Sequence, residues 1–456
     1  FMATPARLTQ GSVVRTLTKL SAPMVGGLFS VIAFNLGDTY FVSQLGTQEL
    51  AAMSFTFPVV MVMMGIAMGL GTATISVVSR AIGQGDETQI RRLSSDSLTL
   101  SFLTVLICAT VGMVTIDPLF LLLGASPDLL PLIRDYMLIW YPGMVCLVIP
   151  MVANSAIRST GDTTFPALIM VGATGLNFVL DPLFIFGVWG FPRWELKGAA
   201  FATVLARATT LVASLLILHF RERLLDFKTP SLRDVWQSWK EIGALAIPVA
   251  ATNMMQPMGL GVVTRLIASY GPASVAAWGA GSRVTAFALI PVFAVCSGLV
   301  PFAGQNWGAG EFGRVQKGRN YAYGFAILWS VLALLALRVF IDPIARIFSL
   351  EPDVVVEVTR YLWIIPFGYL GVGIFNVTEE TLNAIGRPIM ASIQTIIHMF
   401  MLYIPLAFIG SNYLSMDGLL MGLVSADLLG GFIGVLIAWW MCRREQKQED
   451  QTVQTV

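Results

Sequence analysis

Acidic residues inside apolar stretches are the part of this sequence best suited to chemistry. Asp38 lies in one such stretch, and Asp181 lies in another, four residues after Asn177. On a helix, this spacing places Asn177 and Asp181 on one face. If that face meets Asp38, two carboxylates share a secluded pocket, where desolvation and mutual repulsion raise the affinity for a proton. The same oxygens could hold Na⁺ instead, so the residue types leave H⁺ and Na⁺ open.

Both acids also have plainer explanations. Asp38 could face water among lipid headgroups, and Asp181 precedes Pro182, which is an ordinary signal for the end of a helix. A charged side chain within hydrocarbon costs at least about 2.5 kcal/mol, however, and such residues usually serve a function. We therefore expect Asp38, Asn177 and Asp181 to form an ion-coupling site.

Membrane-spanning helices must position these residues. Of the 456 residues, 56% are hydrophobic and only 12% are charged, whereas soluble proteins carry about 25% charged residues. A spanning helix needs about 20 mostly apolar residues. The sequence thus predicts an all-α polytopic membrane protein in a lipid bilayer. Twelve transmembrane helices are expected near 17–43, 50–79, 94–117, 132–157, 164–188, 197–220, 241–268, 275–304, 316–340, 356–383, 389–411 and 417–442.

Composition argues against several other functions. The formal net charge of +1 gives no reason to expect nucleic acid as a partner. The four cysteines are scattered, and there are only two histidines, so we expect neither a disulfide framework nor a bound metal. No HExxH or GxSxG motif occurs. We therefore expect no enzyme and no cofactor other than a coupling ion.

The two halves of the chain are related by an internal repeat. Pro248 follows Pro23 by 225 residues, and Gly386 follows Gly161 by the same interval. Six helices per half is an even number, so both halves share one orientation, an arrangement found in transporters rather than in simple channels or receptors. The predicted domains are a first lobe (1–220), a cytoplasmic linker (221–240), a second lobe (241–442) and a cytoplasmic tail (443–456).

The loops differ in their content of basic residues. Most Lys and Arg residues at the predicted helix ends fall on the side of the amino terminus. Cytoplasmic loops carry an excess of basic residues. Both termini are therefore predicted to be cytoplasmic.

Four motifs, in this order along the chain, point to a known family. They are Asn35-Leu36-Gly37-Asp38, the segment 78–86 (VSRAIGQGD), Arg158-Ser159-Thr160-Gly161-Asp162, and the segment 177–182 (NFVLDP). With them the chain resembles the multidrug and toxic compound extrusion (MATE) family along essentially its whole length, and within it the DinF-like bacterial branch. The resemblance implies a monomer in the bacterial cytoplasmic (inner) membrane that contributes to antibiotic resistance.

The resemblance also implies a function and a site. The function is export of cationic or amphipathic drugs and dyes in exchange for H⁺ or Na⁺, by alternating access between two lobes. The positions that match the family's polar network are Asp38, Tyr136, Asn154, Asn177, Asp181 and, less closely, Thr203.

The repeat does not preserve the two acids of the first half. At the offset of 225, Asp38 corresponds to Val263 and Asp181 corresponds to Leu406. This asymmetry places ion coupling in the first lobe.

The second half nevertheless offers secondary candidates. Asp427 could pair with Arg283, an interaction that we interpret as structural. Glu379 and Glu380 are adjacent, so at most one would line a cavity, and both could simply lie near the cytoplasmic end of their helix.

Pro23 lies about four helical turns before Asp38. Proline removes a backbone donor and clashes one turn back, so this helix should bend there. Our hypothesis is that protonation of Asp38 shifts the helix between straight and bent forms and so expels substrate. The alternative is a fixed kink.

Substrate residues are harder to identify from the sequence. Methionine suits surfaces that accept many shapes, and Met53, Met61, Met63, Met64 and Met68 could line a cavity or equally face lipid. A flippase for lipids or lipid-linked oligosaccharides is the rival interpretation. It should need a basic cavity, and few arginines lie within the predicted helices: Arg283 and, near helix ends, Arg207 and Arg265.

Overall fold

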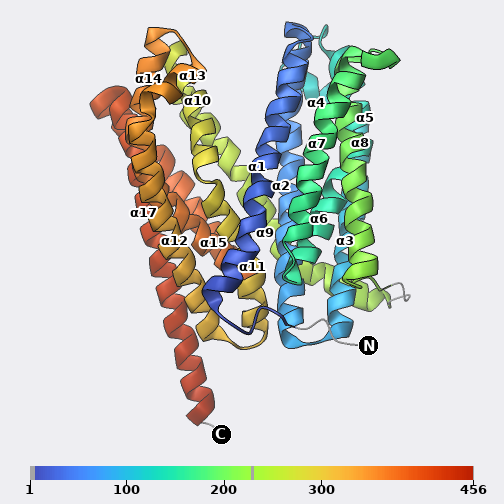
Figure 1. Ribbon diagram of the computed structural model, residues 1–456, viewed down its shortest axis with the longest axis vertical. Helices are drawn as coiled ribbons and strands as arrows, with labels where there is room; N and C mark the ends of the chain where they lie inside the picture. The colour runs from blue at the N-terminus through green and yellow to red at the C-terminus, as the bar shows by residue number, and fades with distance from the viewer. Residues whose placement is uncertain (1–5, 227–230, 455–456) are drawn as a thin grey trace. The chain divides into compact units, whose positions relative to one another are not determined.

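The computed structural model describes residues 6–226 and 231–454, and every regular element in these ranges is a helix. The predicted all-α fold class is therefore confirmed. The chain separates into two compact units (Figure 1). The first comprises residues 6–10 and 22–250, and the second comprises residues 11–21 and 251–454. Two helices, one at the start of each half of the chain, contribute to both units.

The first unit consists mainly of helices from the first half of the chain. In chain order these are α1 (Val13–Ser43), α2 (Thr47–Gln84), α3 (Glu87–Val114), α4 (Ile116–Leu122), α5 (Leu130–Gly143), α6 (Val145–Ser159), α7 (Thr164–Phe186), η1 (Val188–Gly190), α8 (Glu195–Leu216) and the π-helical turn η2 (Ile217–Arg221). Together α5 and α6 form the fourth predicted crossing, interrupted at Met144.

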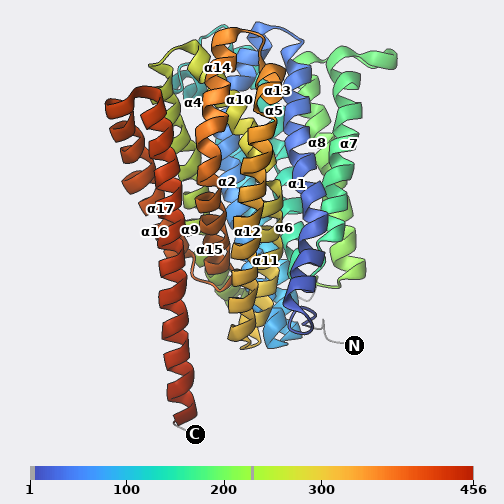
Figure 2. The same ribbon diagram turned by 60° about the vertical axis from the view of Figure 1, so that its left-hand side comes forward.

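The second unit repeats this arrangement. Its helices are α9 (Leu232–Ala268), α10 (Pro272–Ala288), α11 (Ile290–Gly308), α12 (Phe312–Val339), α13 (Ile341–Phe348), α14 (Pro352–Ile364), η3 (Ile365–Gly368), α15 (Tyr369–Ala384), α16 (Pro388–Ile396), the π-helical turn η4 (Ile397–Tyr403) and α17 (Ile404–Gln454). Figure 2 shows α16 beside the long helix α17.

The described helices account for the predicted crossings. Nine are long and apolar enough to span a membrane, and the bent pair α10–α11 makes a tenth. The stretch Pro388–Trp440 counts twice, because the chain reverses at Leu414 and Ser415, where Gly410 packs against Gly418. The 37-residue helix α9 is also long enough to cross.

Glycines of the repeat make tight turns between helices. Gly85 ends α2 in the left-handed region (φ 79°), and its N–H donates to Ala81 O at 3.1 Å. Asp86 then caps α3, because its carboxylate accepts a hydrogen bond from the Gln89 N–H at 3.0 Å. Gly310, at the equivalent position of the second half, has φ 76°. Glycine adopts this conformation without steric cost, which explains its presence in both halves.

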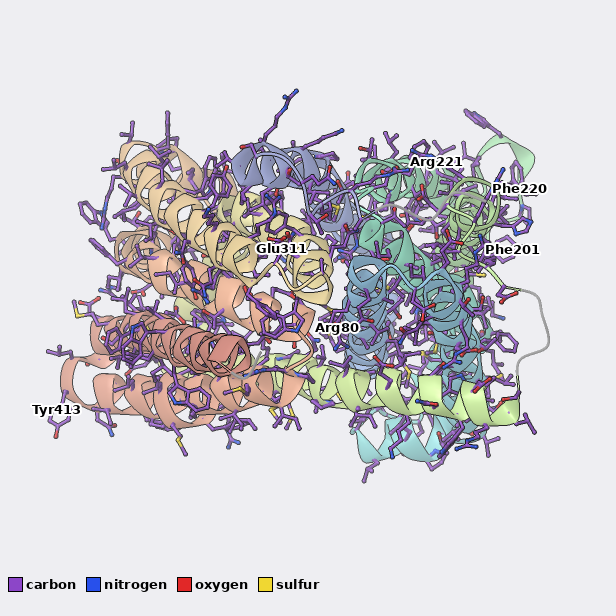
Figure 3. All side chains as sticks on the ribbon, turned by 90° about the horizontal axis from the view of Figure 1, so that it is seen from below. Arg80, Phe201, Phe220, Arg221, Glu311 and Tyr413 are labelled. Carbon is purple, nitrogen blue, oxygen red and sulfur yellow. The ribbon has the colours of Figure 1, made fainter. Side chains whose placement is uncertain are left out.

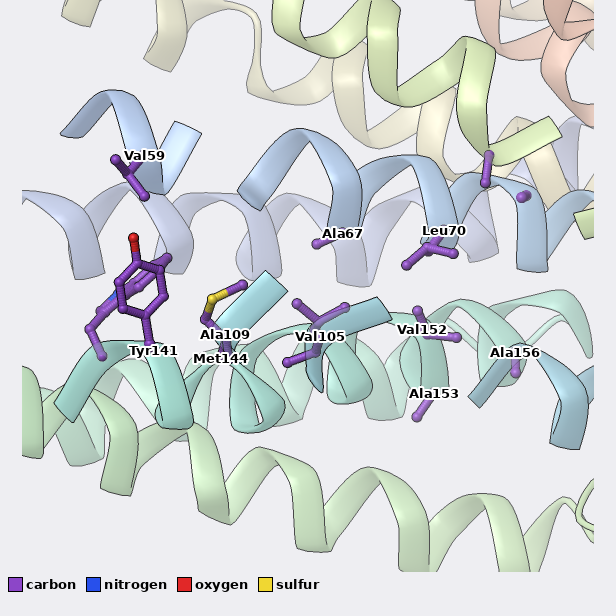
Figure 4. Packing of buried hydrophobic residues seen from close by; sticks show 14 of the residues in the cluster. Val59, Ala67, Leu70, Val105, Ala109, Tyr141, Met144, Val152, Ala153 and Ala156 are labelled. Carbon is purple, nitrogen blue, oxygen red and sulfur yellow. The ribbon is translucent and has the colours of Figure 1, made fainter. Parts of the chain in front are cut away.

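Small residues let the helices of the first unit pack closely. Leu70 of α2, Val105 of α3 and Val152 of α6 meet in one buried cluster (Figure 4). Gly112 of α3 faces the ring of Tyr141, and a Cβ at this position would overlap the ring. Close backbone approach of this kind is the usual basis of helix association in membranes.

The start of α9 differs from the prediction. The helix begins at Leu232 rather than near 241, so part of the predicted linker is helical. Ser231 Oγ accepts a hydrogen bond from the Asp234 N–H at 3.2 Å, which satisfies a free donor at the helix start. Arg92 of α3 donates to Ser238 Oγ at 3.2 Å. These polar contacts let a segment too polar for hydrocarbon fold as a helix against α3.

Arg80 and Arg221 are labelled in Figure 3, which views the protein from below, and both form ion pairs at this end of the first unit. Arg80 lies 3.7 Å from Glu241, and Arg221 lies 2.9 Å from Asp162. The Arg221 guanidinium also stacks on Phe165 at 3.9 Å. Partly exposed pairs of this kind add only about 0–1 kcal/mol each. They show how this end accommodates its many basic side chains.

Candidate functional site

The first unit contains a cavity of about 380 Å³ between α1, α2, α5, α6 and α8. Its walls are mostly apolar, and three of the predicted methionines line it: Met53, Met61 and Met64. The polar members of the lining are Asn35, Asp38, Thr39, Thr56, Tyr136, Thr203 and Arg207. The cavity is therefore an apolar space with a few polar groups, as is typical of small-molecule sites.

Asp38 places a carboxylate in this cavity. Its Oδ1 is buried and has no hydrogen-bond partner among the described residues. Arg207, Tyr136 and Asp181 all lie within electrostatic range of this carboxylate. Buried polar atoms are nearly always paired, so an unpaired one at a cavity wall is where a proton, an ion or a substrate group would bind.

Asn177 and Asp181 share one face of α7, as their spacing predicts. Both are fully buried, and Asn177 Nδ2 donates to Asp181 Oδ1 at 3.1 Å. Asn177 Oδ1 and Asp181 Oδ2 have no hydrogen-bond partner in the described chain. Thr174 of α7 donates to the backbone oxygen of Ser30 in α1 at 3.0 Å, so α7 packs against the helix that carries Asp38.

The remaining members of the predicted network are only partly brought together. Tyr136 of α5 and Thr203 of α8 line the cavity with Asp38. Asn154 of α6 is not among the described lining residues. The side-chain oxygens of Asn154 and Thr203 are buried and unpaired within the described ranges.

Arg207 is the cavity residue that sequence reasoning missed. Its guanidinium lies 4.4 Å from the centre of the Phe34 ring, and its buried Nε has no hydrogen-bond partner among the described residues. Arg207 is predicted near the outer end of its helix, where arginines usually reach headgroups, but it lies near the middle of α8 (Glu195–Leu216). Two features of the sequence could have identified Arg207 as a cavity residue. It lies within an otherwise apolar helix, and it lies on the same side of that helix as Thr203.

The oxygens of this site suit either coupling ion. The unpaired acceptors of the described site include Asp38 Oδ1, Asn177 Oδ1 and Asp181 Oδ2. A carboxylate can take up a proton, and carboxylate and amide oxygens are also ligands for hard cations. The chemistry of these groups therefore fits both H⁺ and Na⁺.

The secondary candidate Asp427 has a different partner from the one that the sequence suggests. His398 Nε2 lies 3.1 Å from Asp427 Oδ1, whereas Arg283 is exposed on α10, so the suggested pairing of Asp427 with Arg283 is wrong. The reversal between the last two crossings brings His398 opposite Gly430. A Cβ at Gly430 would overlap the imidazole ring. The missing side chain lets the ring reach Asp427.

The other second-unit candidates lie on α15. Glu379 is half-buried and accepts a hydrogen bond from Thr395 Oγ1 at 3.5 Å. Glu380 is also half-buried and interacts electrostatically with Glu379. Val263, the counterpart of Asp38, is buried in the apolar core of the second unit. The second unit thus has an apolar side chain where the first has its cavity acid.

Pro23 lies inside α1, which is helical on both sides of it. Residues 11–21 belong to the second unit and residues from Ala22 onward belong to the first. The proline therefore lies next to the point where α1 passes from one unit to the other.

Gly37 permits the close approach of α1 and α7 beside Asp38. A Cβ at this position would lie 2.6 Å from Phe178 Cζ. We expect Gly37→Ala to cost about 1–3 kcal/mol by overpacking and to lower export by separating the two helices. Gly26→Ala is the control, because no atom lies within 4 Å of its added Cβ. Thermal unfolding and dye export are the measurements, and equal behaviour of the two variants would contradict this account of the α1–α7 contact.

Comparisons with known proteins agree with this architecture. The sequence model of the MatE family matches residues 23–183 and 248–409, one match in each half of the chain. A protein from Shewanella oneidensis named FAD transporter is 37% identical over 435 residues, which cover 95% of this chain and 96% of that protein. The multidrug export protein MepA of Staphylococcus haemolyticus is 24% identical over 95% of both chains.

A solved structure has the same fold. The Vibrio cholerae MATE transporter VcmN, crystallised in a form described as bent, superimposes with a TM-score of 0.90 and 30% identity. The match covers 95% of this chain and 98% of that one. With its two family matches and its two six-helix lobes, this chain belongs to the MATE family of membrane transporters.

Proposed function

We propose that this protein is a secondary active exporter of small amphipathic organic compounds, with Asp38 as its coupling carboxylate. The observation that carries the proposal is the position of Asp38. It lines the cavity of the first unit with an unpaired oxygen, and a second buried acid, Asp181, lies within electrostatic range. One group can then meet both the coupling ion and the substrate. We take H⁺ as the coupling ion, with Na⁺ as the alternative.

Coupling requires two conformations and an ion that prefers one of them. Uptake of a proton by Asp38 removes a negative charge that acts on Arg207, Tyr136 and Asp181. The balance of forces on α1 changes, and we propose that α1 responds by bending at Pro23. The cavity would then narrow and release its substrate, and loss of the proton would reset the helix.

Two substrate classes deserve direct comparison. The methionine-rich and aromatic lining of the cavity suits organic cations and other amphipathic compounds. The 37%-identical relative is named FAD transporter, which makes flavin nucleotides the second candidate class. A flippase remains the alternative function, and Arg207 is the one basic residue among the described residues that line this cavity.

We further infer that the protein acts as a monomer in the bacterial inner membrane, with both termini in the cytoplasm. The distribution of basic residues supports this orientation. Accessibility of single cysteines placed at the ends of the chain to a membrane-impermeant reagent would test it.

Efflux from proteoliposomes tests the proposed function. Vesicles loaded with ethidium or FAD would receive either a pH jump or a Na⁺ jump. We expect the pH jump to drive concentrative efflux. Efflux driven only by Na⁺ would support the proposed exporter function but would identify Na⁺ as the coupling ion. If neither gradient moves either compound, the proposal fails, and movement of a lipid-linked sugar becomes the next measurement.

A further inference from the structure

Arg207 gives the cavity a permanent positive charge that the coupling mechanism does not require. Its guanidinium stays protonated in proteins and offers five N–H donors. It projects from α8 into the cavity, stacks on Phe34 at 4.4 Å and leaves its buried Nε without a hydrogen-bond partner in the described chain. Charged groups at membrane depth are costly and are usually retained for a function.

Asp38 is the acid that shares the cavity with Arg207, and the two interact electrostatically. The other ionisable groups that face Asp38 are Tyr136 from α5 and Asp181 from α7. The described cavity lining from α2 and α6 contains no ionisable side chain. With Asp38 ionised, the two cavity charges offset each other. When Asp38 is neutral, the guanidinium has no counter-charge among the described residues that line the cavity.

The walls next to this charge are aromatic. Phe34 lies under the guanidinium, and Phe57 and Trp140 also line the cavity. Aromatic faces bind planar rings by stacking. A guanidinium binds phosphate or carboxylate through paired hydrogen bonds.

We propose that Arg207 binds the anionic group of an aromatic substrate, so that this cavity accepts aromatic organic anions of the nucleotide type as well as organic cations. This inference rests on the proposed function, because it concerns the same cavity. It makes Arg207 a specificity-determining residue. At a fixed conformation of α1, before any bending, the anion binds best when Asp38 is neutral, and a cation binds best when Asp38 is ionised.

A matched pair of ligands isolates the contribution of a phosphate group to binding. FMN and riboflavin share a planar ring system and differ by one phosphate group. Their binding to the purified full-length protein can be followed by flavin fluorescence at one fixed pH, with ethidium as the cationic ligand. We expect the wild type to bind FMN at least about tenfold more tightly than riboflavin, which corresponds to about 1.4 kcal/mol.

Two substitutions should act in opposite directions. Arg207→Gln should lower the affinity for FMN about tenfold, leave riboflavin nearly unchanged and raise the affinity for ethidium. Asp38→Asn should raise the affinity for FMN and lower that for ethidium. Arg207→Lys should restore part of the FMN affinity. Arg265→Gln, an exposed arginine of the second unit, is the control and should change none of these values.

The reciprocal pattern distinguishes recognition from structural damage. A variant that merely destabilises the fold would weaken the binding of FMN, riboflavin and ethidium alike. That result for Arg207→Gln would overturn the inference. Equal binding of FMN and riboflavin by the wild type would also overturn it. If ethidium efflux under a pH gradient persists in that case, the proposed function stands and only the role of Arg207 falls.

Discussion

Asp38→Asn is expected to reduce gradient-driven efflux of ethidium from proteoliposomes by at least about tenfold, which corresponds to about 1.4 kcal/mol. Asparagine has nearly the same shape as aspartate but cannot bind and release a proton. The carboxylate lines the cavity with an unpaired oxygen, so in the proposed mechanism its loss removes the group that takes up and releases the coupling proton. Initial efflux rates after a pH jump, normalised to the amount of reconstituted protein, are the measurement.

Asp128→Asn provides the matched control for this variant. Asp128 is exposed in the segment that precedes α5, so Asp128→Asn removes the same charge from a position outside the cavity. It should transport like the wild type. If Asp38→Asn also couples efflux to the gradient, the coupling site lies elsewhere, and Asp181, Asp427 and Glu379 become the residues to test.

Pro23→Ala is expected to impair export severely while leaving the protein folded. A proline inside a helix costs about 3 kcal/mol, so alanine restores a backbone hydrogen bond and favours the straight form of α1. If transport depends on bending, a straighter α1 should lower the efflux rate by about tenfold or more. The thermal unfolding midpoint should stay equal or rise.

Pro58→Ala separates this effect from a general response to removing proline. Pro58 lies within α2 and is exposed rather than part of the cavity lining. It should therefore affect stability more than transport. Normal efflux by Pro23→Ala would contradict the hinge and leave Pro23 as the site of a fixed kink.

Much of the fold could be predicted because membrane helices have a simple signature. Runs of about 20 apolar residues and the interval of 225 between Pro23 and Pro248 were sufficient to predict two related halves. The start of α9 was harder to predict. Its first residues are too polar for hydrocarbon, and polar contacts such as the Ser231 cap and the hydrogen bond from Arg92 to Ser238 explain why they are helical.

The candidate site was predictable where a residue type was unusual for its surroundings. Asp38 and Asp181 stand out as acids among apolar residues, and the spacing of Asn177 from Asp181 fixes their shared face. The position of Arg207 depends on the rotation of α8 about its axis, which hydropathy does not reveal. The partner of Asp427 depends on the reversal between the last two crossings, which brings His398 to it.

Simultaneous recording of substrate and proton movement tests the central claim most directly. Proteoliposomes that contain a pH-sensitive dye would receive a substrate gradient without an imposed pH gradient. We predict that substrate leaving the vesicles drives protons inward through the wild type. The same gradient should move no protons through Asp38→Asn, even though substrate still leaves the vesicles down its own gradient. Substrate-dependent proton movement of equal size in both proteins would contradict the assignment of Asp38 as the coupling carboxylate.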